Sequence, residues 1–102
     1  MGILDRFRKK TEEVEIVSRR PVGSFKVEKV LKVLTRQVLV GKVLEGLIYP
    51  GYKLKGRKAG VVMKIEKDHR EVDFAVAGDK VALTLENEIP CEENETLEIY
   101  QS

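Results

Sequence analysis

The side chains best suited to covalent or acid–base chemistry in this 102-residue sequence are His69 and Cys91. Nucleophilic catalysis needs a base within hydrogen-bond reach of the nucleophile, and His69 is the only histidine. It stands in the charged run Lys67 to Glu71, which is typical of a solvated loop. Cys91 lies between Pro90 and Glu92, and acidic neighbours raise the pKa of a thiol. The sequence therefore predicts no catalytic residue and no enzyme.

A phosphate-binding loop is approached by the segment Gly51-Tyr52-Lys53-Leu54-Lys55-Gly56-Arg57-Lys58, in which two glycines stand five residues apart. That chemistry needs a lysine directly after the second glycine, then Ser or Thr, then a helix whose amides face the phosphates. Arg57 and Lys58 occupy those places, and the next segment has the pattern of a strand. We interpret the segment as a hairpin loop without a nucleotide site.

Metal and cofactor chemistry finds equally little support. The single cysteine excludes an intramolecular disulfide and a multi-cysteine zinc site. The carboxylates between Glu86 and Glu98 have no histidine or closely spaced loop ligands among them, which favours a solubilising surface over a calcium loop. The sequence predicts no metal and no cofactor.

Charge is nearly balanced overall but unevenly distributed. The chain has 19 Lys+Arg and 17 Asp+Glu, a net charge of +2, yet residues 18–60 hold eleven basic and two acidic side chains and residues 61–102 hold four and eleven. This asymmetry permits a basic face, although interleaved strands could cancel it. The many Lys, Glu and Arg beside two Asn and two Gln are typical of proteins that work at high temperature. No apolar run reaches the roughly 18 residues of a membrane span and no secretory leader is visible, so we expect one cytosolic domain.

From Phe25 onward, most of the sequence has the two-residue alternation that is typical of β-strands. Gly-containing turns separate short alternating runs that recur about every ten residues, which indicates a barrel or a sandwich. Tyr49-Pro50-Gly51-Tyr52 has Pro and Gly at the second and third positions of a tight turn. The expected strands lie around 38–44, 61–65, 72–76, 81–85 and 97–100.

Two segments leave alternatives open. In Ser24 to Leu34 the residues Val27, Val30, Leu31 and Leu34 have helical spacing, so the local pattern fits a helix as well as a strand. Residues 1–10 could form a short amphipathic helix with Ile3, Leu4 and Phe7 on one side. That helix would be a basic membrane or partner anchor, a frayed end, or a helix that rests its apolar side on the domain, and we favour the last two.

The stretch from Val27 to Leu85 resembles domain 2 of the translational GTPases, the β-barrel that follows the G domain in elongation factor Tu. The resemblance is carried by Gly41-Lys42-Val43-Leu44-Glu45-Gly46-Leu47-Ile48-Tyr49-Pro50-Gly51-Tyr52-Lys53-Leu54, by Lys64-Ile65-Glu66, and by Val72-Asp73-Phe74-Ala75-Val76-Ala77-Gly78-Asp79-Lys80-Val81-Ala82-Leu83. It covers a little over half of the chain. It implies an all-β fold, a small closed antiparallel β-barrel, with a strand across Ser24 to Leu34.

The resemblance also implies a role. Relatives that deliver tRNA hold its aminoacylated 3′ end on this barrel, and Glu66 is similar to the acidic residue that contacts the terminal adenosine. Lys29 and Lys80 replace an acidic residue and an asparagine of those factors, which adds positive charge that suits phosphate. Nothing in the sequence resembles a G domain, so the resemblance implies a module without GTPase activity of its own.

We therefore expect an N-terminal amphipathic segment and linker over 1–23 and the barrel over 24–102. The barrel is predicted to bind RNA, either tRNA or ribosomal RNA, without catalysis. The alternative is a module that docks to a ribosomal or RNA-processing protein. The candidate RNA-binding residues are Lys29, Arg36, Lys42, Lys53, Lys55, Arg57, Lys58, Glu66 and Lys80.

Overall fold

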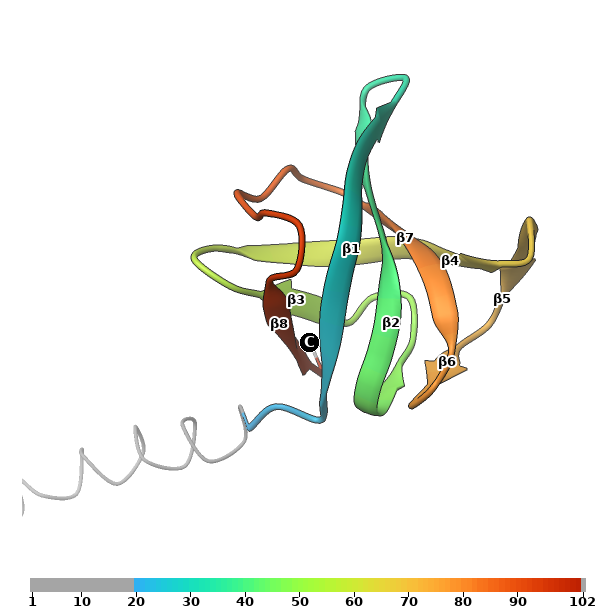
Figure 1. Ribbon diagram of the computed structural model, residues 1–102, viewed down its shortest axis with the longest axis vertical. Coiled ribbons are helices and arrows are strands. Elements are labelled where there is room, and N and C mark those ends of the chain that lie inside the picture. Colours follow the sequence, from blue (N-terminus) through green and yellow to red (C-terminus); the bar gives the residue numbers. More distant parts are fainter. Residues whose placement is uncertain (1–19, 102) are drawn as a thin grey trace, which may run out of the picture.

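Residues 20–101 are described by a computed structural model and form eight strands, with no helix among them (Figure 1). The first two strands are long and the others short. The strands are β1 (Gly23–Val33), β2 (Arg36–Ile48), β3 (Lys53–Lys55), β4 (Ala59–Lys67), β5 (Arg70–Val72), β6 (Ala75–Val76), β7 (Lys80–Leu85) and β8 (Thr96–Tyr100). The predicted all-β class is confirmed. The predicted amphipathic segment lies outside the described residues.

Six of the strands close into a barrel. Their order is β1-β8-β3-β4-β7-β2, and β2 pairs back with β1, so the sheet returns to its first strand. Every pairing is antiparallel. The short strands β5 and β6 lie outside the ring as extensions of β4 and β2. The predicted small closed antiparallel barrel is confirmed, and closure leaves the ring without a free edge.

The interior is filled by the inward-facing residues of the alternating strands. In β7, Val81, Leu83 and Leu85 are buried while Lys80 is exposed, as the two-residue period of a strand requires. The buried core consists of Phe25, Val27, Leu39, Val43, Ile48, Leu54, Val62, Ile65, Ala75, Val81, Leu83, Leu85, Ile89, Leu97 and Ile99. Charged side chains therefore have only the outer surface of the barrel available to them.

The ambiguous segment Ser24 to Leu34 is a strand. Its apolar residues do not share one face: Val27 is fully buried, whereas Leu31 is 43% exposed and Leu34 is 92% exposed in the turn after β1. Pairing with β2 along the length of β1 supplies the backbone hydrogen bonds that a local helix would otherwise provide. Non-local pairing overrides the local helical pattern here. Figure 1 shows the resulting β1–β2 hairpin projecting from one end of the barrel.

The predicted turn at Pro50 and Gly51 is also confirmed. The amide of Tyr52 donates a hydrogen bond to the carbonyl of Tyr49 at 3.1 Å, and Gly51 has a φ of 97°. That φ is open to glycine and strained for other residues. The turn directs the chain from β2 into β3 on the far side of the barrel.

Candidate nucleic-acid interface

A row of three lysines crosses three neighbouring strands of the barrel. Lys26 on β1 pairs with Lys42 on β2, and Lys42 pairs with Lys80 on β7. All three are exposed, because the residues that flank them along each strand face the interior. Residues that are directly paired across strands point to the same face of a sheet. We call Lys26, Lys42 and Lys80 the lysine row.

The next row of paired residues runs around the outside of the barrel over four strands. It contains Lys29 on β1, Val40 on β2, Ala82 on β7 and Glu66 on β4, each paired with the next. Lys29 and Glu66 thus stand at opposite ends of the row. With strands about 4.8 Å apart, three strand spacings, or about 14 Å along the curved sheet, separate them. Lys29 adds positive charge to the lysine row but does not lie beside Glu66.

Two carboxylates in or beside these rows form ion pairs with lysines. Glu28 contacts Lys80 at 3.1 Å, and Glu66 contacts Lys64 at 3.6 Å. The side chains of Glu66 and Lys64 are 40% and 43% exposed, and exposed ion pairs of this kind contribute about 0–1 kcal/mol, so a ligand could displace them at little cost. For Glu66 this geometry is that of a surface carboxylate beside Lys64.

Arg36 begins β2, directly after the turn at the tip of the projecting hairpin. Its guanidinium Nη1 donates a hydrogen bond to the backbone carbonyl of Glu86 at 2.8 Å. Nearby, Lys32 contacts Glu88 at 3.3 Å. Arg36 therefore fastens the segment after β7 to the hairpin, and its other donors are available on an exposed side chain.

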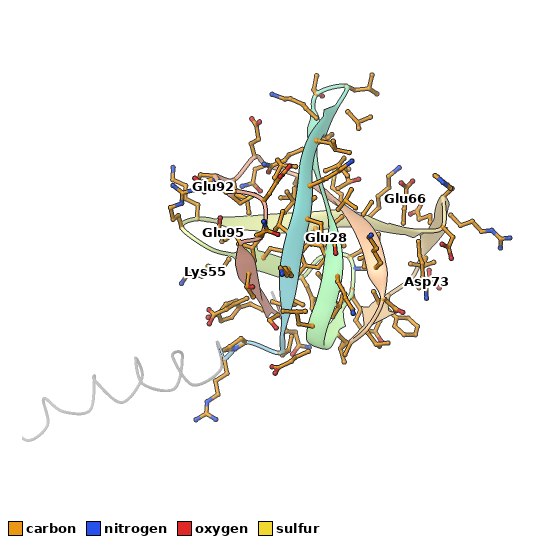
Figure 2. The ribbon with its side chains drawn as sticks, in the orientation of Figure 1. Glu28, Lys55, Glu66, Asp73, Glu92 and Glu95 are labelled. Carbon is orange, nitrogen blue, oxygen red and sulfur yellow. The ribbon has the colours of Figure 1, made fainter. Side chains whose placement is uncertain are left out.

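The remaining four predicted residues lie elsewhere. Lys53 and Lys55 are on β3, and Arg57 and Lys58 are in the loop that follows it. In the ring of six strands, β3 is three positions from β2 in either direction, which places it on the opposite side of the barrel. Figure 2 shows Lys55 and Glu66 well apart, because Lys55 pairs with Ala59 at the start of β4 and Glu66 lies near the end of that strand. The nine predicted residues therefore do not share one face. Four lie on β1, β2 and β7, four lie on β3 or in the loop after it, and Glu66 lies on β4, the strand between β3 and β7.

Acidic side chains accompany the β3 group. Lys55 pairs with Glu98 on β8, and its ammonium also lies 5.8 Å from the centre of the Tyr100 ring. The hydroxyl of Tyr100 donates a hydrogen bond to Glu98 at 2.7 Å, which raises the pKa of Tyr100. These contacts make the β3 side less uniformly positive than the lysine row.

Lys26 belongs to the lysine row but was not among the predicted candidates. A signal for it exists in the sequence: once Ser24 to Leu34 is known to be a strand, Phe25 and Val27 must face inward and Lys26 outward. While the sequence left a helix possible for this segment, the inward and outward alternation of a strand could not be used to place Lys26. The partner of Lys26 across the sheet depends on the register with β2, which the local sequence does not contain.

A hydrogen-bonded turn positions Lys80 at the start of β7. The carboxylate of Asp79 accepts hydrogen bonds from the amide of Val76 and from the ammonium of Lys67, both at 3.0 Å. The bond from the Val76 amide, followed by that from Lys67, lowers the pKa of Asp79, and the bond to Asp79 raises the pKa of Lys67. The carbonyl of Asp79 also accepts a hydrogen bond from the amide of Val43, which ties the turn to β2.

The two residues considered for catalysis lie on different connections, Cys91 between β7 and β8 and His69 between β4 and β5. Cys91 is partly buried; burial raises the pKa of its thiol, with a further contribution from Glu95. The predicted rise is confirmed, although burial contributes more than the acidic neighbour. His69 is exposed in the turn between β4 and β5.

Within residues 20–101, no helix has the length and apolar character needed to cross a bilayer.

The closed antiparallel barrel and the family match below define the class of the protein: it is a β-barrel domain of the translation-protein type. Residues 20–98 match the family described as "Elongation factor Tu domain 4", so the chain belongs to that family. The resemblance to a β-barrel of the translational GTPases is thereby confirmed; the matching family is described as domain 4, where the motifs resembled domain 2.

Curated relatives point the same way. An alignment of 82 residues with "Probable translation initiation factor IF-2" of Pyrobaculum calidifontis has 38% identity and covers 62% of this chain and 14% of that protein. The protein of the same name from Pyrobaculum neutrophilum is 32% identical over 106 residues, which cover 85% of this chain and 17% of the relative. The chain thus spans only about one sixth of the length of these relatives.

Solved structures share the fold. The crystal structure of GDP-bound aIF5B from Aeropyrum pernix matches 93% of this chain with a TM-score of 0.69 and 24% identity. The bacterial selenocysteine-specific elongation factor EF-Sec matches 98% with a TM-score of 0.66 and 23% identity. This chain covers 18% of each of those chains, so it corresponds to one domain of a larger protein in both.

Proposed function

We propose that this translation-factor domain binds RNA, either tRNA or ribosomal RNA, through the outer face of β1, β2 and β7, and that it does so without catalysis. The observation that carries the proposal is the register that aligns Lys26, Lys42 and Lys80 on adjacent strands. Lys29 follows in the next row. Because ribosomes and tRNA are its proposed partners, we place the protein in the cytoplasm.

The lysine row is electrostatically unfavourable in the free protein. Like charges directly opposite one another on neighbouring strands destabilise a sheet, by up to about 1 kcal/mol a pair. Glu28 offsets part of this repulsion through Lys80. A polyanion would offset it further, since phosphates that are neutralised by lysines release their condensed counterions. A face that is unfavourable alone and satisfied by phosphate suits a nucleic-acid backbone.

The test compares one lysine on each side of the barrel. Lys42→Gln removes the middle of the row, and Lys53→Gln removes an exposed strand lysine on the opposite side. We expect Lys42→Gln to weaken binding to bulk tRNA several-fold and to lower the dependence of log K on log salt by about one, as one lost phosphate contact does. Lys53→Gln should leave both nearly unchanged. Fluorescence anisotropy titrations at low and moderate salt measure the affinity for tRNA and its salt dependence.

Either of two results would overturn the proposal. The wild-type protein could fail to bind tRNA at low salt, where phosphate contacts are strongest. Alternatively, the two variants could weaken binding equally, which would mean that the attraction comes from overall charge. Circular dichroism of both variants verifies that each keeps the barrel.

Glu66 adds a finer proposal about the end of the RNA. A carboxylate accepts hydrogen bonds from ribose or base donors, and the contact with Lys64 at 3.6 Å is long enough to yield to a stronger partner. We expect Glu66→Ala to weaken binding to tRNA with an intact 3′ end more than binding to tRNA that lacks it. Equal losses would make Glu66 an ordinary surface charge.

A second candidate function, docking to a ribosomal or RNA-processing protein, is favoured by the tip of the β1–β2 hairpin. Leu34 is 92% exposed there, with Val33 52% exposed beside it. An exposed apolar tip on a projecting hairpin suits insertion into a pocket of another protein. Co-purification of one defined partner with wild-type protein, and its loss with Leu34→Lys, would support docking.

A further inference from the structure

A patch of four exposed apolar side chains lies at the end of β2, away from the hairpin tip. Leu47 pairs with Val76 on β6, and one step further the ring of Tyr49 stacks on that of Phe74 at 5.5 Å between centroids. The residues between them, Ile48 and Ala75, are buried, so the four side chains all point outward. We call Leu47, Tyr49, Phe74 and Val76 the apolar patch.

The patch is open along its whole extent. Its four members are between 36% and 49% exposed, and together they account for nearly half of the large hydrophobic residues exposed in the described part of the chain. Contiguous apolar surface on a small domain marks a binding site, and aromatic residues are enriched at the centres of such sites. The patch therefore has the character of a binding site for an apolar segment.

The described chain begins directly beside this patch. Gly23 pairs with Gly46, and the backbone of Val22 lies in van der Waals contact with Gly46, the residue before Leu47. The carbonyl of Gly46 in turn accepts a hydrogen bond from the amide of Ala77, the residue after Val76. Figure 1 shows that the chain enters β1 at the same end of the barrel at which β2 meets β6.

The sequence before this point supplies a matching segment. Ile3, Leu4 and Phe7 have the spacing that places them on one side of a helical turn. Residues 11–19 join them to the barrel, and nine residues can span about 30 Å when extended, which exceeds the distance to a patch beside the start of β1. A segment tethered so closely reaches the patch at a high effective concentration.

Charge distinguishes this occupant from RNA. Residues 1–10 contain Arg6, Arg8, Lys9 and Lys10 against one carboxylate, Asp5. Along the chain, the patch is flanked by the exposed carboxylates Glu45 and Asp73 (Asp73 is labelled in Figure 2). An acidic border attracts a basic segment and repels a polyanion.

We propose that Ile3, Leu4 and Phe7 dock on the apolar patch, so that the N-terminal segment caps the β2–β6 end of the barrel. The capping contact is independent of the lysine row, which lies at the middle of β2. It leaves the proposed RNA-binding face open.

Paramagnetic relaxation in the full chain tests the proposal. Cys91→Ser removes the native thiol, and Gly2→Cys carries a nitroxide next to the segment. We expect the amide signals of residues 47, 49, 74 and 76 to lose more than half of the intensity that they have in the same sample after the nitroxide is reduced. The amides of Leu34 and Thr35, at the far end of the thirteen-residue strand β2, should keep theirs. Adding Phe7→Asp should restore the patch signals.

Three outcomes would overturn it: no loss at the patch, a uniform loss over the barrel, or a loss at the patch that survives Phe7→Asp. Docking of the segment of a second copy is tested by mixing two samples. One is spin-labelled protein at natural isotope abundance, and the other is ¹⁵N-labelled protein without the spin label. Loss of the patch signals in that mixture would mean that the segment of another molecule occupies the patch. Failure here would leave the tRNA-binding comparison of Lys42 with Lys53 unaffected.

Discussion

Glu28 on β1 and Lys80 on β7 form an ion pair at 3.1 Å although β2 lies between their strands. The register of β1 against β2 shifts between Val27 and Lys29, so Glu28 is the extra residue of a β-bulge. A bulge re-aims its side chain, and here the carboxylate reaches across β2 to the end of the lysine row. The same bulge brings Lys29 opposite Val40, on the outer face.

Glu28→Gln should therefore strengthen binding to tRNA. Without the carboxylate, Lys80 is free to contact a phosphate, and we expect a several-fold gain in affinity at low salt with a salt dependence steeper by up to about one. Glu98→Gln, on the neighbouring strand β8, where the carboxylate accepts a hydrogen bond from Tyr100, provides the control and should change binding less. Anisotropy titrations measure both; unchanged or weaker binding by Glu28→Gln would contradict the proposed role of the row.

Glycine substitutions should distinguish strain from steric overlap. Gly46 has a φ of 76°, and a Cβ there would overlap the carbonyl oxygen of Val22, whereas Gly51 has a φ of 97° with open space around it. Gly51→Ala should lose only the roughly 1–2 kcal/mol of a left-handed backbone. Gly46→Ala must also displace the chain that enters β1, so it should lose more than about 3 kcal/mol or fail to fold. Urea unfolding of the two variants measures the difference, and equal losses would contradict it.

The segment Ser24 to Leu34 shows what the sequence could predict and what it could not. Its apolar spacing fitted a helix, and only the resemblance to the translation-factor barrels indicated a strand. The physical reason lies in the next strand, β2, whose backbone pairs with β1 from Gly23 to Val33 at sequence separations of 3 to 23 residues. Local patterns predict a strand when its alternation is strict, as in 81–85, and fail when pairing with another strand decides the conformation.

The candidate site was predictable in its residue types but not in its grouping. A basic half of the sequence suggested one basic face, yet β2 and β3, which both belong to that half, lie on opposite sides of the ring. Strand order separates residues that are close in sequence, such as Lys42 and Lys53, and it joins Lys26 to Lys80. Register and order depend on the whole fold, so composition alone could not assign the face.

Gln37 should be the most costly polar residue to replace. It is 7% exposed; its side-chain amide donates to the carbonyl of Ile89 at 3.0 Å, and its side-chain oxygen accepts from the amide of Ile89 at 2.9 Å. Gln37→Leu leaves both backbone groups buried and unpaired, which we expect to lower the free energy of unfolding by about 2–4 kcal/mol. Asn87 forms the same kind of double contact with Ala59 and Val61 on the surface.

Asn87→Ala is therefore the matched control for Gln37→Leu. Water can replace its partners, so the loss should stay below about 1 kcal/mol. Urea denaturation with an unchanged slope measures both values. Similar losses for the two variants would show that burial of the Gln37 contacts does not add to their strength.

Asp79 should make part of the stability depend on pH. Hydrogen bonds from the Val76 amide and from Lys67 lower the pKa of its carboxyl below the ordinary value of 3.8. A lowered folded-state pKa means that the stabilisation is fully present above the unfolded value and is lost as the pH falls through the folded value. The contact also raises the pKa of Lys67 above 10.5, so its contribution persists below that value and disappears only in strong alkali.

Asp79→Asn should consequently lower the free energy of unfolding by roughly 1 kcal/mol, with a constant difference from wild type between about pH 5 and pH 9. Below about pH 4 the difference should shrink, because the wild-type carboxylate becomes protonated and loses its attraction for Lys67. Asp73→Asn, which changes an exposed carboxylate, should show no such plateau. Chemical unfolding at a series of pH values measures the curves; a difference that grows as the pH falls would mean that the Asp79 carboxylate does not stabilise the turn.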